Sequence, residues 1–269
     1  MGDVSVLSWP AQARLATALA EMADHPASWL GLGYRDAGRL RLVVVPDVDG
    51  MRRFSGGRAP AWGAGLAFPS TRTIVIRADG GDPRQTLRHE LAHLVFHDAV
   101  RTRVPLWFDE GYAAVAASEW DRMDAFRLSW IVLRRDLPGF RELDGSLRAN
   151  ATAAEKAYTL ATSAVLELGR RNPAGTLDSL LARLARGEDF NSAVLGSTGL
   201  TMDEFEADWQ RAIKRRYNIV IWLSAGGFWL VVSLAVGVVW YLRRRYDRPR
   251  RLALNQGWEI AEEKPPEEV

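Results

Sequence analysis

Residues 82–99 read DPRQTLRHELAHLVFHDA and hold three of the four histidines in a chain of 269 residues. The segment has the start of a helix: Asp82 suits the N-cap, Pro83 suits the first helical position, and Gln85 completes a capping-box pattern. We therefore predict a helix from Pro83 to about Asp98. Residues four apart lie on the same face of a helix, one turn above the other. His89 and His93 are therefore predicted to face one point in space.

The pair His89 and His93 belongs to an HExxH sequence, HELAH, with Glu90 beside the first histidine. Two imidazoles one turn apart can bind one metal ion, and the adjacent carboxylate can act as a general base toward a water on that ion. The chain has no cysteine, which excludes thiolate-held metal sites and disulfide scaffolds. Imidazole and carboxylate are the ligands of catalytic rather than structural zinc sites.

A catalytic zinc needs three protein ligands and one open position. His97 lies about 12 Å along the axis from His89 at 1.5 Å per residue, too far to share an ion on a straight helix, so we expect it to be a solvated or helix-end histidine. Glu110 and Asp109, in PLWFDEGYA (105–113), are the other candidates. We expect the aromatic residues of this segment to pack it against the first helix. Glu110 then points at the histidine pair, and Asp109, rotated by about 100°, is the fallback ligand.

HELAH, followed seventeen residues later by the Glu of WFDEG, resembles the gluzincin metallopeptidases and, among them, the bacterial peptidase-MA-like group. The resemblance extends over about residues 40–217. It implies that His89, His93 and Glu110 are zinc ligands and that Glu90 is the catalytic base. It also implies an α+β, zincin-like fold, with a small mixed sheet and the HExxH helix followed by a helical subdomain.

Residues 157–168 are similar to the helix of that family which carries a tyrosine near the metal. The match implies that Tyr158 stabilises the oxyanion by donating a hydrogen bond, whereas its sequence context alone is equally compatible with core packing. Residues 73–78 are expected to form the edge strand that pairs with an extended substrate. Thermolysin-type enzymes orient a ligating histidine with an Asp four residues after the ligand Glu. Ala114 stands there, so another group must orient the histidines.

Residues 1–218 as a whole are predicted to form one peptidase domain. Strands are expected at 40–46, 62–68 and 73–78. Helices are expected at about 8–22, 105–118, 120–135, 152–171, 176–186 and 202–217.

Residues 219–242 are 24 residues without a formal charge. As one helix they would span a hydrocarbon core of about 30 Å, so the sequence predicts a transmembrane helix and the lipid bilayer as a partner. Six arginines follow it within 15 residues, against four basic residues before it. The positive-inside rule then predicts a single-pass protein with an extracytoplasmic peptidase domain, although the first 24 residues lack the features of a signal peptide. Residues 243–269 are predicted to be a short, disordered cytoplasmic tail.

The charged residues nearly balance: 35 basic against 33 acidic give a net charge of +2, which argues against a nucleic-acid partner. The expected function is a membrane-anchored metallopeptidase that binds one Zn²⁺ and hydrolyses peptides or proteins with a zinc-bound water activated by Glu90. Two alternatives stay open: a catalytically silent zinc-binding receptor or assembly domain on the membrane, and a zinc amidase acting on cell-wall peptides. The sequence assigns neither the specific substrate nor the oligomeric state.

Overall fold

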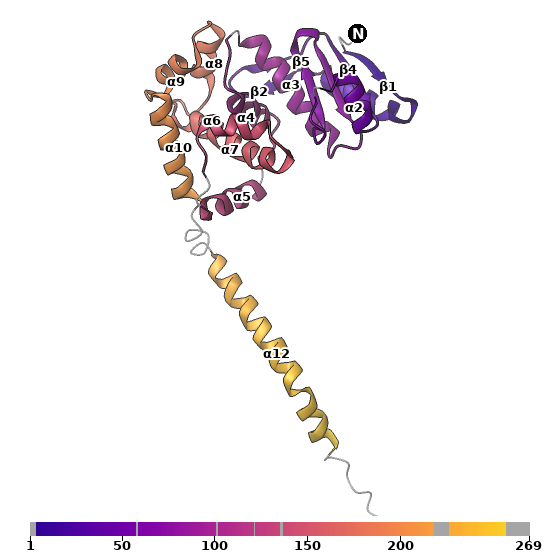
Figure 1. Ribbon diagram of the computed structural model, residues 1–269, viewed down its shortest axis with the longest axis vertical. Coiled ribbons are helices and arrows are strands. Elements are labelled where there is room, and N and C mark those ends of the chain that lie inside the picture. The colour runs from indigo at the N-terminus through magenta and orange to yellow at the C-terminus, as the bar shows by residue number, and fades with distance from the viewer. Residues whose placement is uncertain are drawn as a thin grey trace, which may run out of the picture. The chain divides into compact units, whose positions relative to one another are not determined.

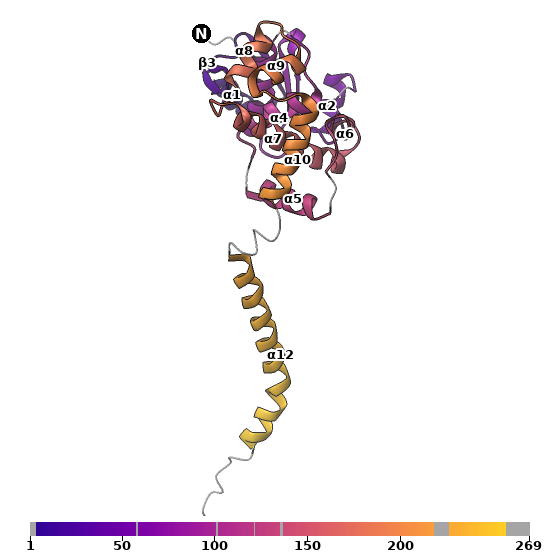
Figure 2. The ribbon, with the colours of Figure 1, turned by 90° about the vertical axis from the view of Figure 1, so that its left-hand side faces the viewer.

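A computed structural model describes residues 4–57, 59–100, 102–120, 122–134, 137–217 and 226–256. The chain divides into two compact units, Met1–Tyr217 and Asn218–Val269. The first unit contains a small mixed sheet and then a helical half, as the sequence predicts. In Figure 1 the strands gather at one end of this unit and α8, α9 and α10 lie at the other; Figure 2 views the unit from the side of these three helices.

The sheet has four strands in the order β1 (Val4–Ser8), β4 (Leu40–Val45), β6 (Thr73–Arg77) and β5 (Gly65–Phe68). β1, β4 and β6 run parallel, and β5 pairs antiparallel with β6. The predicted hairpin is confirmed, but the expected edge strand at 73–78 is wrong. β6 is hydrogen-bonded on both sides, because β1 and β4 extend the sheet beyond it. The free edge on this side is β5.

The two faces of β4 enter different cores. Leu42 and Val44 pack into the main core with α1 (Ala13–Ala23) and α3 (Pro83–Ala99). The alternate residues Val43 and Val45 pack on the opposite face, which α2 (Val48–Ser55) covers. Because successive side chains of a strand point to opposite faces, a strand covered on both sides is apolar throughout. A short separate hairpin, β2 (Ala27–Trp29) and β3 (Gly33–Arg35), completes the strands of the described residues.

The helical half contains seven helices in the described residues: α4 (Leu106–Ala116), α5 (Arg122–Leu133), α6 (Phe140–Leu147), α7 (Ala151–Arg171), α8 (Asp178–Ala185), α9 (Phe190–Thr198) and α10 (Met202–Arg216). Five of them are predicted by the sequence. The other two, α6 and α9, have only eight and nine residues, too few turns for an apolar period to stand out.

The helices α4 and α7 approach closely at Gly111. A Cβ atom on Gly111 would lie 2.6 Å from the backbone oxygen of Ala161 and 2.8 Å from a methyl carbon of Val165. One turn earlier on α4, the Trp107 ring stacks on Phe140 of α6 at a centroid distance of 4.2 Å. The two contacts hold α4, which carries the WFDEG segment, against α7 and α6.

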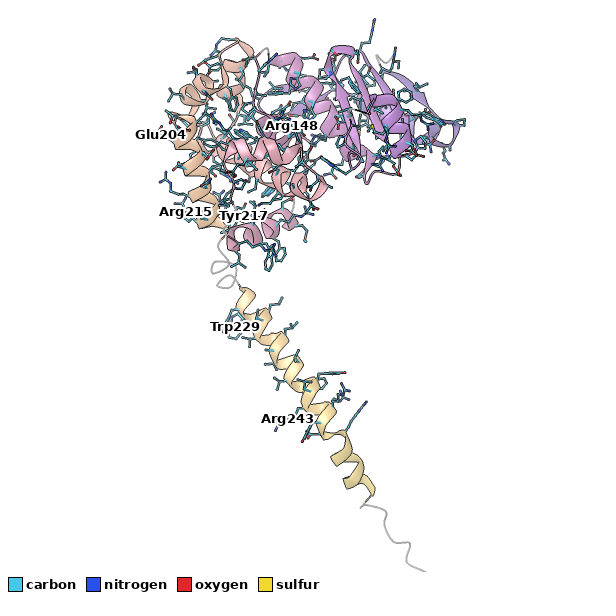
Figure 3. All side chains as sticks on the ribbon, viewed as in Figure 1. Arg148, Glu204, Arg215, Tyr217, Trp229 and Arg243 are labelled. Carbon is cyan, nitrogen blue, oxygen red and sulfur yellow. The ribbon has the colours of Figure 1, made fainter. Side chains whose placement is uncertain are left out.

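The second unit contributes α12 (Phe228–Gln256) to the described residues. Its side chains are apolar over most of 228–242, and arginines follow directly; Figure 3 labels Trp229 in the first part and Arg243 where the arginines begin. At 1.5 Å per residue the stretch 228–242 is about 22 Å long, shorter than a hydrocarbon core of about 30 Å. In the part of the chain that the structure describes, no helix is both long enough and apolar enough to cross a membrane.

The expected transmembrane helix at 219–242 is corrected by this finding. The sequence argument takes 24 uncharged residues as one helix, whereas α12 begins at Phe228, and residues 218–225 lie outside the described residues. The single-pass topology and the extracytoplasmic placement of residues 1–218 depend on that helix and are corrected with it; the bilayer as a partner is not supported either. Residues 243–256, predicted as part of a disordered tail, continue α12, and 257–269 lie outside the described residues.

The substitution Gly111→Ala tests the approach of α4 to α7. The added methyl group has no space against the α7 backbone, and overpacking of this kind costs about 1–3 kcal/mol. We expect urea unfolding of the full chain to show that loss. The control is Gly145→Ala in α6, where a Cβ meets no atom within 4 Å and the gain in helix propensity is about 0.5–1 kcal/mol. Equal effects of the two substitutions would contradict this packing.

Candidate metal centre

The helix α3 starts as the sequence predicts. The Asp82 carboxylate accepts a hydrogen bond from the Arg84 backbone amide at 2.9 Å, and Pro83 occupies the first turn. One face of α3 is buried in the main core through residues such as Leu87 and Leu94. His89 and His93 lie on another face, where they line a cleft of about 770 Å³ together with residues of β5, α4 and α7.

Three nitrogen and oxygen atoms converge in this cleft. The Nε2 atoms of His89 and His93 are 3.2 Å apart, and Oε2 of Glu110 is 3.5 Å and 3.6 Å from them. Ligands at 2.0–2.2 Å from a tetrahedral zinc ion are separated from one another by about 3.3–3.6 Å. The donor set of two imidazoles and one carboxylate, and its spacing, therefore fit a zinc ion. Glu110 is placed where the sequence predicts it.

Each histidine is also held by a carboxylate on its far side. Nδ1 of His89 is 3.1 Å from Oε1 of Glu119, and Nδ1 of His93 is 2.9 Å from Oδ1 of Asp109. When Nδ1 of a neutral imidazole carries the proton and donates a hydrogen bond to the carboxylate, the lone pair of Nε2 faces the other two metal-binding atoms. These carboxylates orient the histidines, the role that the sequence leaves unassigned.

Asp109 and Glu119 reach these positions for different reasons. Asp109 precedes Glu110 on α4, and the rotation of about 100° per residue that removes it from the ligand position carries it to the far side of His93. Glu119 follows the end of α4, where Ser118 has a φ of 59° and turns the chain back. The position of Asp109 could be predicted from the sequence, because the rotation per residue of a helix is known. The position of Glu119 could not, because nothing in the sequence signals the turn at Ser118.

His97 is exposed, and its Nε2 lies 2.9 Å from Oδ2 of Asp109. His93, His97 and Asp109 therefore form a second group whose donor atoms lie within 4.8 Å of one another. Asp109 already joins its two oxygens to the two imidazoles. This arrangement lets His97 hold Asp109, and through it His93, in place.

Glu90 lies under the edge strand β5. Its side chain is buried, and its carboxylate lies against Gly65 of β5. A Cβ on Gly65 would be 2.5 Å from Oε1 of Glu90 and 2.6 Å from a methyl carbon of Thr86. Only a glycine lets β5 pass this close to α3, so the position of Glu90 depends on Gly65.

The charges of the centre are strongly coupled. Burial would lower the pKa of His89, but hydrogen bonds to Glu110 and Glu119 outweigh it and raise this pKa to about 10. The pKa of His93 is raised in the same way by Asp109 and Glu110. Burial raises the pKa of Asp109, but its hydrogen bonds to His93 and His97 prevail and lower it to about 2. Glu110 also has a lowered pKa, because both imidazoles outweigh its burial. The surrounding carboxylates thus favour positive charge at the point where the imidazoles meet.

Tyr158 of α7 lines the same cleft. Its ring centroid is 6.4 Å from that of His89 and 6.2 Å from that of Trp62. Burial and the negative charge of Glu110 raise the pKa of the phenol far above 10. Tyr158 therefore keeps its proton and can donate a hydrogen bond in the cleft. Tyr158 thus lines the same cleft as the other four residues of the predicted site, which are His89, Glu90, His93 and Glu110.

The model of the Peptidase MA superfamily matches residues 58–215, more than half of the chain. The matched range includes β5, the whole of α3 and α4, and Tyr158 on α7. This superfamily is typically metal-dependent, which agrees with the His and Glu groups that converge in the cleft. No curated protein matches the chain significantly. On the strength of the family match, the chain belongs to the Peptidase MA superfamily.

Proposed function

We propose that this chain is a zinc-dependent metallopeptidase that hydrolyses peptide bonds in the cleft between β5 and the α3–α4 pair. The observation that carries the proposal is the convergence of donor atoms from His89, His93 and Glu110 beside the buried carboxylate of Glu90. Membership of the superfamily supports a peptidase. The donor set of two imidazoles and one carboxylate, together with its spacing, supports zinc as the ion.

In this proposal His89, His93 and Glu110 are the metal ligands. When held by them, a zinc ion would act as a Lewis acid and would activate a water molecule for attack. Asp109 and Glu119 hold the imidazole rings so that both Nε2 atoms face the ion.

Glu90 is the proposed general base. It accepts a proton from the attacking water and then delivers it to the leaving amine, which are the two proton transfers that peptide hydrolysis requires. Burial raises the pKa of its carboxyl group, against the opposing charges of His89 and His93. A raised pKa makes the carboxylate a better proton acceptor near neutral pH. The close packing of Gly65 over the Glu90 side chain keeps the carboxylate beside β5.

Tyr158 is the proposed donor to the carbonyl oxygen as negative charge develops on it. The phenol stays protonated, and its contact with Trp62 holds the ring in the cleft. Loss of one such preorganised donor costs about 10²–10³ in kcat. The substrate itself is expected to lie extended along β5, where the unpaired edge of the sheet can bind peptide backbone.

The substitution Glu90→Gln tests the proposal most simply. The amide cannot accept the proton, so we expect cleavage of an unfolded protein substrate by the full chain to fall by about 10²–10⁴-fold. The zinc ligands are untouched, so the zinc content is expected to stay at one ion per chain. Glu21→Gln, an exposed change on α1, is the control and should retain full activity.

The outcome also separates the alternatives. Full activity of Glu90→Gln would contradict the mechanism. One bound zinc with no cleavage of any protein or peptide library by the wild-type chain would instead support a catalytically silent zinc-binding domain. Cleavage confined to cell-wall peptides would identify an amidase that uses the same residues.

The substitutions Asp109→Asn and Glu119→Gln test the groups that orient the histidines. Each removes a charged hydrogen bond to an Nδ1 atom, and changes of this kind lower metal affinity by about 10–100-fold. Competition with a chromogenic chelator measures the affinity. The matched control is Asp98→Asn. Asp98 lies on α3, the helix that carries the histidines, but its carboxylate pairs with Arg72. A similar loss in the control would show that the effect is general destabilisation.

A further inference from the structure

Arg148 differs from the other charged groups of the cleft. Among the described residues that line the cleft it is the one Arg or Lys. Three of the four carboxylates of the lining already have partners, because Glu110, Asp109 and Glu119 bond to imidazoles. The fourth, Glu90, is buried under β5. None of them pairs with Arg148, and its guanidinium makes no ion pair with any described residue.

The backbone at Arg148 is held in place on both sides. It is the C-cap residue of α6, and its amide bonds to the carbonyl of Gly145. Further back in α6, the Asp144 carboxylate accepts a hydrogen bond from the Trp107 backbone amide at 2.7 Å, which fixes α6 to the start of α4. Two residues after Arg148, the Asn150 side chain caps α7. In Figure 3 Arg148 lies between the strands of the first unit and α10.

Apart from Arg148, the cleft lining presents four carboxylates and three imidazoles, and each imidazole already faces one of these carboxylates. None of these imidazoles is left to bind a negatively charged part of a substrate. An unpaired guanidinium on the wall of such a cleft offers the complementary charge at one point. Arg is also the side chain best shaped for this role, because its planar fork forms two parallel hydrogen bonds to a carboxylate.

We propose that Arg148 binds a carboxylate of the peptide substrate and makes the cleft selective for peptides that carry one near the scissile bond. The carboxylate is either the side chain of an Asp or Glu residue or the C-terminal carboxylate. Arg148 is therefore a specificity-determining residue that takes no part in the proton transfers. The inference rests on the proposed peptidase function for its meaning, but its test is a binding measurement that requires no turnover.

The test uses the full chain with Glu90→Gln, loaded with zinc, so that bound peptide is not consumed. Fluorescence anisotropy measures the affinity of three labelled peptides of otherwise identical sequence. One has an internal Asp and an amidated C-terminus, one has Asn there and a free C-terminus, and one has Asn with an amidated C-terminus. We expect one of the first two to bind about tenfold or more tightly than the third, and this peptide identifies the source of the carboxylate.

Adding Arg148→Gln should remove this preference and leave the affinity for the neutral peptide within about twofold. Arg148→Lys should restore part of it, because lysine keeps the charge but not the fork. The matched control is Arg186→Gln, since Arg186 is also an exposed C-cap residue of an eight-residue helix, but lies outside the cleft.

Two results would overturn the assignment. One is equal affinity for all three peptides in the chain that retains Arg148. The other is a loss of affinity on Arg148→Gln that is as large for the neutral peptide as for the preferred peptide with a carboxylate. Cleavage by the chain with Glu90 intact is measured separately. A binding preference without cleavage would leave the role of Arg148 standing and count against the peptidase function.

Discussion

Two imidazole nitrogens that face each other at 3.2 Å are the constraint on which the rest of the site depends. If both rings carried a full positive charge at this distance, they would repel each other by about 5 kcal/mol at an effective dielectric constant of 20. If neither carried a proton at Nε2, two lone pairs would face each other. Either a proton on one Nε2 that is donated to the other nitrogen, or a cation bound by both, relieves this conflict. For a cation, Glu110 supplies a third donor at matching distances. The outer carboxylates Asp109 and Glu119 fix the rings in this arrangement.

The fold keeps this arrangement by two close approaches that only glycine permits. Gly65 brings β5 down onto Glu90, and Gly111 brings α4 onto α7. The first sets the distance between the proposed general base, Glu90, and the edge strand. The second positions the helix that carries Asp109 and Glu110, while Trp107 and its stacking partners hold the start of the same helix. The site thus combines side chains from α3 and α4 in a geometry set by packing in the layers around them.

The residues that the sequence predicts correctly are those governed by local geometry. The helical period places His89 and His93 on one face, and the N-cap at Asp82 fixes where that helix begins. The sequence also brings Glu110 to the pair. It misses the role of Glu119, because this depends on a left-handed turn at Ser118 with no glycine to signal it. It takes β6 for the edge strand, because the pairing of β6 with β4 joins strands far apart in the chain and has no local signal.

The transmembrane prediction fails for a related reason. The prediction takes 24 uncharged residues as one helix, whereas α12 as described contains only the part of this stretch from Phe228 onward. Residues 218–225 lie outside the described residues. The sequence also fails to predict α6. This helix is short, and its place depends on the long-range hydrogen bond between Asp144 and the start of α4.

The most direct measurement of the central claim is X-ray absorption spectroscopy at the zinc edge on the full chain, loaded with one equivalent of zinc. The account predicts a four-coordinate ion with two imidazole nitrogens at about 2.0–2.1 Å and oxygen ligands at about 2.0–2.2 Å. A spectrum with three imidazoles would place His97 in the ligand set in place of Glu110. That result, or a failure to bind zinc stoichiometrically, would contradict the account.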